Sequence, residues 1–147
     1  MAYMFQGCAS LKELDFSNFN TELVRDMSSM FSTCYDLMSL DLRSFKTPLV
    51  TNMSSMFYRP NKLESIDFSN AITTNVTNMG QMFYGCSKLK YLDIRNFDFI
   101  KVTSHTSMFY GIPVDCEIIV KDEDARTWVL ARRSDLTNVK IVAELGE

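Results

Sequence analysis

The sequence predicts an α/β repeat solenoid, because one 26-residue pattern recurs along most of its 147 residues. The dipeptide Met-Phe returns at a constant interval without insertion or deletion, and columns of Leu, Asp and Val keep the same register. A unit of this size cannot bury an apolar face alone, whereas stacked units share one continuous core. The copies of the dipeptide are Met4-Phe5, Met30-Phe31, Met56-Phe57, Met82-Phe83 and Met108-Phe109.

The overall composition is that of an ordinary folded protein and excludes several classes. Apolar residues make up 46% of the chain and charged residues 22%, which excludes intrinsic disorder. The net charge of −3 provides no basic excess for binding nucleic acid. No apolar run reaches the ~20 residues needed to span a bilayer, and no signal segment follows Met1.

Each repeat contains a short predicted strand. The stretch 37–42 reads Leu-x-x-Leu-Asp-Leu and alternates over its last residues, which is typical of a strand with one buried face. Ser69-Asn70 and Asn96 supply turn chemistry directly after the strands. The apolar positions of the strands are expected to stack in one column, formed by Leu14, Leu40, Ile66 and Leu92.

A short helix is predicted in the second half of each repeat. Apolar residues recur there at three- to four-residue spacing, which marks one face of a helix. Asp26, Asn52 and Asn78 precede the first Met and are expected to act as N-caps. About four to five coils of strand, turn, helix and return should therefore stack into a right-handed solenoid. In one repeat the apolar residues are Val50, Met53, Met56, Phe57 and Leu63.

These residues carry a family resemblance. The pattern Val-Thr-Asn-Met-x-x-Met-Phe-x-x-Cys-x-x-Leu-x-x-Leu-Asp resembles the 26-residue repeat of BspA-like leucine-rich-repeat proteins of bacterial surfaces, a family also catalogued as a domain of unknown function. The resemblance covers residues 1–112. It implies a cell-surface or extracellular location and the binding of a protein or glycan, such as a component of host matrix or of another cell.

The period ends after residue 112, and residues 113–147 are predicted to form a C-terminal cap. Cys116–Val120 is predicted as a strand, Asp122–Arg132 as a helix and Val139–Val142 as a closing strand. Trp128 is the largest apolar side chain of this segment and is expected to help cover the open end of the stack.

A column of aspartates is the main candidate for a functional feature. Each Asp lies between two inward-pointing residues of a strand and should point outward, with Arg43 and Arg95 placed to pair with Asp41 and Asp93. A hydrogen-bonded structural role, a ligand-facing role and a bound cation all remain open, although no dedicated calcium loop is present. The candidate partner-binding face comprises Glu13, Asp15, Asp41, Arg43, Asp67, Tyr91, Asp93 and Arg95.

The cysteines and the single histidine do not suggest catalysis. Cys8, Cys34 and Cys86 share one apolar column and are expected to be reduced core residues. With no Cys-x-x-Cys pair and one His, we expect no zinc site. His105 takes a slot that Met holds elsewhere, so partial exposure is expected, and no nucleophile or acid accompanies it. We therefore expect neither a cofactor nor an enzyme.

Two function classes remain. The first is a binding module that engages its partner through the exposed strand face. The second is an architectural stalk or spacer within a larger surface protein. Tyr and Arg are enriched at protein interfaces, so Tyr91, Arg43 and Arg95 beside strict core columns favour binding.

The first repeat is predicted to be incomplete. Met1 falls in the register of Met27, so the chain opens in mid-repeat and we expect a fragment of a longer surface protein. The first coil should then expose an apolar face and an unpaired edge, which favours a weak homo-oligomer. The residues expected on that face are Met4, Phe5, Leu11, Leu14 and Phe16.

Overall fold

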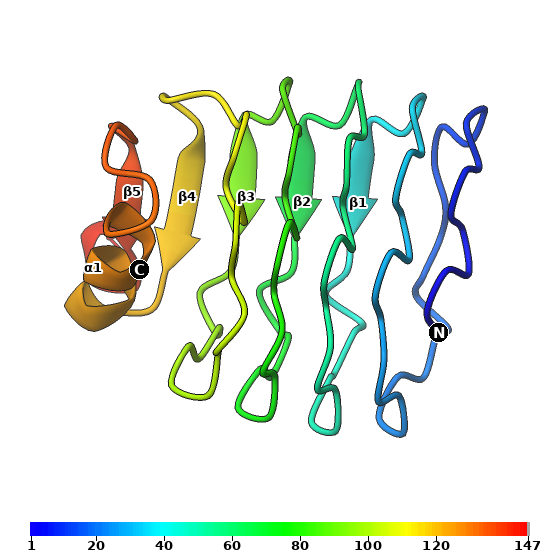
Figure 1. The fold of residues 1–147 in the computed structure, drawn as a ribbon, viewed down its shortest axis with the longest axis horizontal. Coiled ribbons are helices and arrows are strands. Elements are labelled where there is room, and N and C mark those ends of the chain that lie inside the picture. Colours follow the sequence, from blue (N-terminus) through cyan, green and yellow to red (C-terminus); the bar gives the residue numbers. More distant parts are fainter. Residues whose placement is uncertain (147) are drawn as a thin grey trace.

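A computed structural model of the chain describes residues 1–146 and confirms the repeat solenoid. Its parallel strands form one sheet in the order β1-β2-β3-β4-β5, each strand belonging to a successive turn of the chain (Figure 1). The elements are β1 (Ser39–Asp41), β2 (Ser65–Asp67), β3 (Tyr91–Asp93), β4 (Glu117–Val120), α1 (Glu123–Leu130), β5 (Val139–Ile141) and the 3-10 turn η1 (Val142–Glu144).

The register of the sheet follows the sequence period. Leu40 lies opposite Ile66, Ile66 opposite Leu92, and Leu92 opposite Ile118, so the predicted apolar column is confirmed for these coils. Leu14, the first member of the expected column, is half-buried and lies before the first strand of the sheet. The first coil therefore contributes packing but no strand within the described residues.

The second half of each repeat is not the expected short helix. The Phe31 amide donates to the Met56 carbonyl at 2.9 Å, and the Thr33 amide donates to the Tyr58 carbonyl at 2.8 Å, in each case one coil further on. A helix would place these bonds within the segment, and one or two isolated turns are marginally stable in water. Bonding to the next coil satisfies the same backbone groups and joins the coils. The residue spacing thus predicted correctly which face of the segment is buried, but the helical backbone conformation that it predicted is wrong.

The expected N-caps instead stabilise turns. The Asp26 carboxylate accepts a hydrogen bond from the Ser28 amide at 2.8 Å, and the side chains of Asn52 and Asn78 accept equivalent bonds at 3.1 and 3.0 Å. These three residues also pair as parallel bridges between coils, ending at Ser104. Three residues on from each of Asp26, Asn52 and Ser104, the backbone is left-handed, with φ between 54° and 55° at Ser29, Ser55 and Ser107.

The repeated Met-Phe dipeptides build the core. The rings of Phe31, Phe57, Phe83 and Phe109 stack in one column, with successive centroids 5.7, 5.5 and 5.9 Å apart. Phe5 continues this column at the N-terminal end, 5.6 Å from Phe31. The Met-Phe dipeptides supply five of the eleven phenylalanines and five of the ten methionines, and other buried positions of the repeat hold most of the rest.

Buried threonines add a second column that joins the coils. The hydroxyls of Thr21, Thr47 and Thr73 each donate to a carbonyl one coil further on, at 2.7, 2.7 and 2.9 Å. The next position of this column is Phe99, whose ring stacks on Trp128. The column of hydroxyls ends where α1 begins to cover the stack.

The C-terminal segment forms the predicted strand, helix and strand. β4 pairs with β3 in the register of the repeats, and α1 and β5 lie beyond it at the end of the stack (Figure 1). The Asp122 side chain caps α1 by accepting a hydrogen bond from the Ala125 amide at 3.0 Å. No helix among residues 1–146 is long and apolar enough to cross a bilayer.

The first coil is less open than expected. Phe16 is 2% exposed, because its ring packs edge-on against Phe5, Phe19, Phe31 and Phe45. The expectation that Phe16 lies on an exposed apolar face is therefore wrong. Met4 is 50% exposed, whereas Phe5, Leu11 and Leu14 are half-buried.

Candidate binding face

The aspartate column forms a line across the outer side of the sheet. Asp41 lies opposite Asp67, and Asp67 opposite Asp93, on adjacent parallel strands. Asp15 occupies the same position in the first coil. Like charges at strand spacing repel one another, so each carboxylate needs a compensating partner.

Every carboxylate of this column accepts a hydrogen bond from the turn that follows its own strand position. One oxygen of each accepts a hydrogen bond from the backbone amide two residues further on, at 2.8 Å in the first coil and 3.1 Å in the others. The bond fixes the chain where it leaves the sheet. All four members therefore have the hydrogen-bonded role that was one of the interpretations left open by the sequence. The donors are Ser17, Arg43, Ser69 and Arg95.

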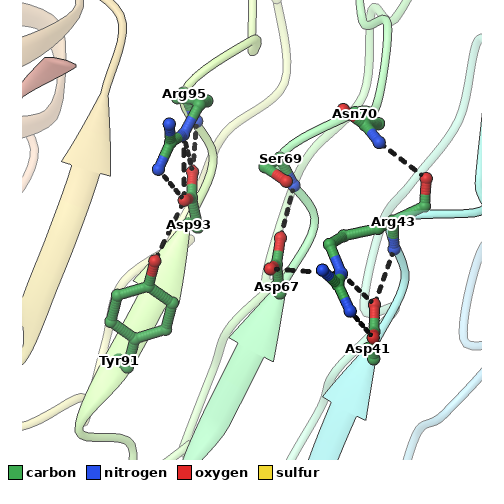
Figure 2. Close-up of polar contacts among 8 residues, drawn as sticks. All are labelled: Asp41, Arg43, Asp67, Ser69, Asn70, Tyr91, Asp93 and Arg95. Carbon is green, nitrogen blue, oxygen red and sulfur yellow. Dashed lines mark hydrogen bonds and ion pairs between the residues drawn. The ribbon is translucent and has the colours of Figure 1, made fainter. Parts of the chain in front are cut away.

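Arg43 connects two carboxylates at the centre of the face. Its Nε and Nη2 donate to the two oxygens of Asp41 at 2.9 and 2.6 Å, and its Nε lies 3.7 Å from Oδ2 of Asp67 (Figure 2). The hydrogen bonds from Arg43 hold the pKa of Asp41 below its ordinary value. The Arg43 side chain is nevertheless 62% exposed, so this cluster remains accessible.

The second arginine cluster is closed. Asp93 is 1% exposed and accepts hydrogen bonds from the Tyr91 hydroxyl at 3.0 Å and from Arg95 Nη2 at 2.7 Å (Figure 2). Burial, together with the bond to Asp93, raises the pKa of Tyr91 to about 12. The predicted pairing of Arg95 with Asp93 is confirmed. However, the carboxylate is covered and offers no free oxygen at the surface.

The N-terminal part of the face is open. Asp15 and Glu13 are exposed, and the hydrogen bond from the Ser17 amide lowers the pKa of Asp15. A shallow groove of about 450 Å³ runs between Asp15 and Arg43. The structure therefore divides the predicted face into an open part and a closed part. The open part consists of Glu13, Asp15, Asp41, Arg43 and Asp67, and the closed part of Tyr91, Asp93 and Arg95.

Further side chains that the sequence analysis did not place on this face also help to build it. The Asn70 amide donates to the Arg43 carbonyl at 2.9 Å, and Ser44 donates to the Phe16 carbonyl at 2.8 Å. Both residues line the groove. Asn96 makes the equivalent bond to the Ser69 carbonyl. The recurrence of Asn or Ser at one position of the repeat was the signal that could have identified them.

The cysteines occupy two environments. Cys34 and Cys86 are buried, and their thiols donate to the carbonyls of Phe5 and Phe57 at 3.0 and 3.2 Å. Burial raises the pKa of Cys34 to about 11, which disfavours the reactive thiolate. Cys8 is exposed, so its assignment to the core is wrong, because none of the coils formed by residues 1–146 packs over that position of the first coil.

His105 and the acidic residues form no metal centre in the described part of the chain. No group of three His, Cys, Asp or Glu side chains among residues 1–146 is placed to hold a metal ion. His105 is half-buried, as expected, with its ring edge-on to Trp128 and its Nε2 3.4 Å from Arg132 Nη2.

Comparison with known proteins identifies a family for this chain. The sequence model of a family described as "Mycoplasma protein of unknown function, DUF285" matches residues 1–118, which include every repeat and the start of β4. No curated protein and no solved structure matches the chain significantly.

Proposed function

The chain belongs to the DUF285 family, whose function is unknown, and from this premise we propose that it is a non-catalytic binding module. Its partner is a protein or a glycan that contacts the exposed face of the sheet. The resemblance of the 26-residue motif to BspA-like leucine-rich repeats supports a place in a bacterial surface protein. We propose accordingly that the module acts at the cell surface or outside the cell.

The Arg43 cluster is the observation that carries this proposal. A guanidinium held by Asp41 and approached by Asp67 keeps one orientation while it stays 62% exposed. A group that is already ordered loses less conformational entropy when a partner binds. Arginine is also enriched at the centres of protein interfaces. The neighbouring groove and Asp15 extend the accessible polar surface.

The electrostatics of the face favour recognition over catalysis. A general acid or base works best with a pKa near the operating pH. The pKa values of Asp15 and Asp41 are instead held below the ordinary value for a carboxyl group by hydrogen bonds. These carboxylates suit permanent negative charge, which orients a partner and accepts its hydrogen bonds.

An architectural spacer is the alternative, and the bonding between coils favours it. Hydrogen bonds and a continuous phenylalanine column run from coil to coil, so the stack is a rigid element of defined length. A spacer needs no recognition surface, so any polar residue could replace Arg43 without loss of function.

Binding to an array of immobilised glycans and a panel of extracellular-matrix proteins tests the proposal. The whole chain should bind at least one of them, and Arg43→Ala should weaken that binding. Arg25→Ala is the matched control, since Arg25 is exposed and lies outside the sheet face. Binding that Arg43→Ala and Arg25→Ala leave equally unchanged would contradict the proposed face. An absence of binding across both panels would favour the spacer.

A further inference from the structure

A column of tyrosines, distinct from the sheet face, runs along the turns that lead into the strands. Tyr58, Tyr84 and Tyr110 occupy equivalent positions of three successive repeats, with ring centroids 5.1 and 4.9 Å apart. Ser32 and Gln6 hold the same position in the earlier repeats, so the fold does not require a ring there. We call these three side chains the tyrosine ladder. Tyr110 is 61% exposed, and the other two are half-buried.

The first two rings of the tyrosine ladder already hold a cation. The Arg59 guanidinium carbon lies 5.5 Å from the ring centroid of Tyr58 and 5.6 Å from that of Tyr84. Both distances are within the range of cation–π attraction. A Cβ atom placed on Gly85 would lie 3.0 Å from Cγ of Arg59, so the arginine stem crosses the bare backbone of this glycine.

The equivalent position one coil further on carries no side chain. Gly85 takes the place of Arg59 in the next repeat, and Gly111 takes it in the repeat after that. A Cβ on Gly111 would meet only backbone atoms of Gly85, the nearest at 3.2 Å. The rings of Tyr84 and Tyr110 are spaced like the pair that holds Arg59. Arg59 already lies over Tyr84 on the side of Tyr58, whereas among residues 1–146 no cation lies over the ring of Tyr110.

We propose that the second pair binds the guanidinium of an arginine side chain supplied by a partner protein. The internal arginine shows which group fits two rings at this spacing. Gly111, which no side chain crosses, leaves room for the incoming stem in the way that Gly85 leaves room for the stem of Arg59. A planar guanidinium stacks on aromatic rings and is less strongly hydrated than an ammonium, which favours arginine over lysine. Arg133, which bonds to the carbonyl of Phe109 next to Tyr110 in the chain, has its charge paired with Asp135.

A peptide titration followed by NMR of the tyrosine rings tests this site on the whole chain. The probes are acetyl-Gly-Gly-Arg-Gly-Gly-amide and the same peptide with citrulline, which keeps the shape of the side chain and removes its charge. The arginine peptide should shift the resonances of Tyr84 and Tyr110 and bind about two- to five-fold more tightly than the citrulline peptide. Equal binding of the two peptides would overturn the proposal.

Three variants locate the site. Tyr110→Leu should abolish the preference for arginine, whereas Tyr35→Leu should retain it, because Tyr35 is also exposed but lies outside the tyrosine ladder. Arg59→Ala should free the first pair of rings, so the arginine peptide should then shift Tyr58 as well. A Tyr110→Leu protein that still prefers arginine, or a Tyr58 resonance that does not move in Arg59→Ala, would contradict the assignment.

Discussion

Phe99 and Trp128 stack face to face, with ring centroids 4.1 Å apart and planes 6° from parallel. Phe99 stands where earlier repeats have a threonine, so the last coil exchanges a hydroxyl-to-carbonyl bond for an aromatic contact. The Arg132 guanidinium carbon lies 3.5 Å from the centroid of the Trp128 ring. These contacts fasten α1 to the end of the solenoid.

We expect Trp128→Ala to lower the free energy of unfolding by about 2–4 kcal/mol, because the substitution removes a large ring from the stack on Phe99. Urea unfolding followed by circular dichroism measures the change. Leu23→Ala is the control, since Leu23 is 85% exposed and its truncation should cost less than about 0.5 kcal/mol. Equal losses in the two variants would mean that α1 contributes nothing to the stability of the stack.

The Met-Phe position of a central coil should be among the most sensitive to truncation. Met56 and Phe57 have no exposed surface, and Phe57 stacks between two other rings of its column. Either Met56→Ala or Phe57→Ala should cost roughly 2–5 kcal/mol of unfolding free energy. A loss below about 1 kcal/mol for both variants in urea melts would show that the column is exposed.

The two arginines of the sheet face should differ in their effect on stability. Arg95→Ala leaves the buried carboxylate of Asp93 without its cation and should cost about 2–4 kcal/mol. Arg43→Ala removes an exposed ion pair and should cost at most about 1 kcal/mol. Parallel thermal and urea unfolding of the two variants compares them. The reverse order would contradict the division into an open and a closed part.

Acid should weaken the fold through Asp41. Its pKa is lowered in the folded protein by the hydrogen bonds from Arg43, so its stabilising contribution is present above the unfolded pKa, ordinarily about 3.9. That contribution is lost as the pH falls through the folded pKa. Asp41→Asn keeps an oxygen that accepts the turn bond but removes the titration. Its melting temperature should therefore fall less than that of the unsubstituted protein between about pH 4 and pH 2.

Glu22→Gln, on an exposed turn, is the matched control for this pH series. The acid-induced change in melting temperature should be smaller for Asp41→Asn than for Glu22→Gln. Identical acid profiles for the two variants would show that the Arg43 cluster does not couple folding to protonation.

The first coil should mediate weak self-association. Tyr3 and Met4 are 59% and 50% exposed beside the half-buried Phe5, which leaves a small apolar surface at this end. We expect a dimer in light scattering at high protein concentration, and Met4→Lys should shift it toward the monomer. Ile100→Lys, which changes an even more exposed apolar residue elsewhere, should not. A monomer at every concentration would exclude this interface.

The sequence predicted the stacking because its columns directly report which positions are buried. It did not predict the backbone between Asp26 and Thr33, since apolar spacing of three to four residues fits a helix as well as a chain bonded to its neighbours. The left-handed conformation of Ser29 has no signal in its residue type. The pattern of apolar residues therefore specified which positions are buried, but it did not determine which backbone groups bond to one another.

The candidate site was predictable only where partners are near in sequence. Arg43 lies two residues after Asp41, so their pairing followed from strand alternation alone. The burial of Asp93 depends on Tyr91 and on β4, which the chain adds one coil later. The tyrosine ladder was visible as a column in the sequence, but the role of Arg59 became evident only from its position across Gly85.

The bonds that run from coil to coil also determine how the molecule resists tension. Phe31 and Phe57 each hold the following coil through a backbone hydrogen bond, and every repeat presents the same connection. A pull on the two chain ends therefore acts on one junction at a time. Each rupture frees one repeat of 26 residues, which is roughly 85–95 Å of extended chain. When the protein is stretched in this way, its repeats should unfold one after another, and its length under tension should increase in regular steps.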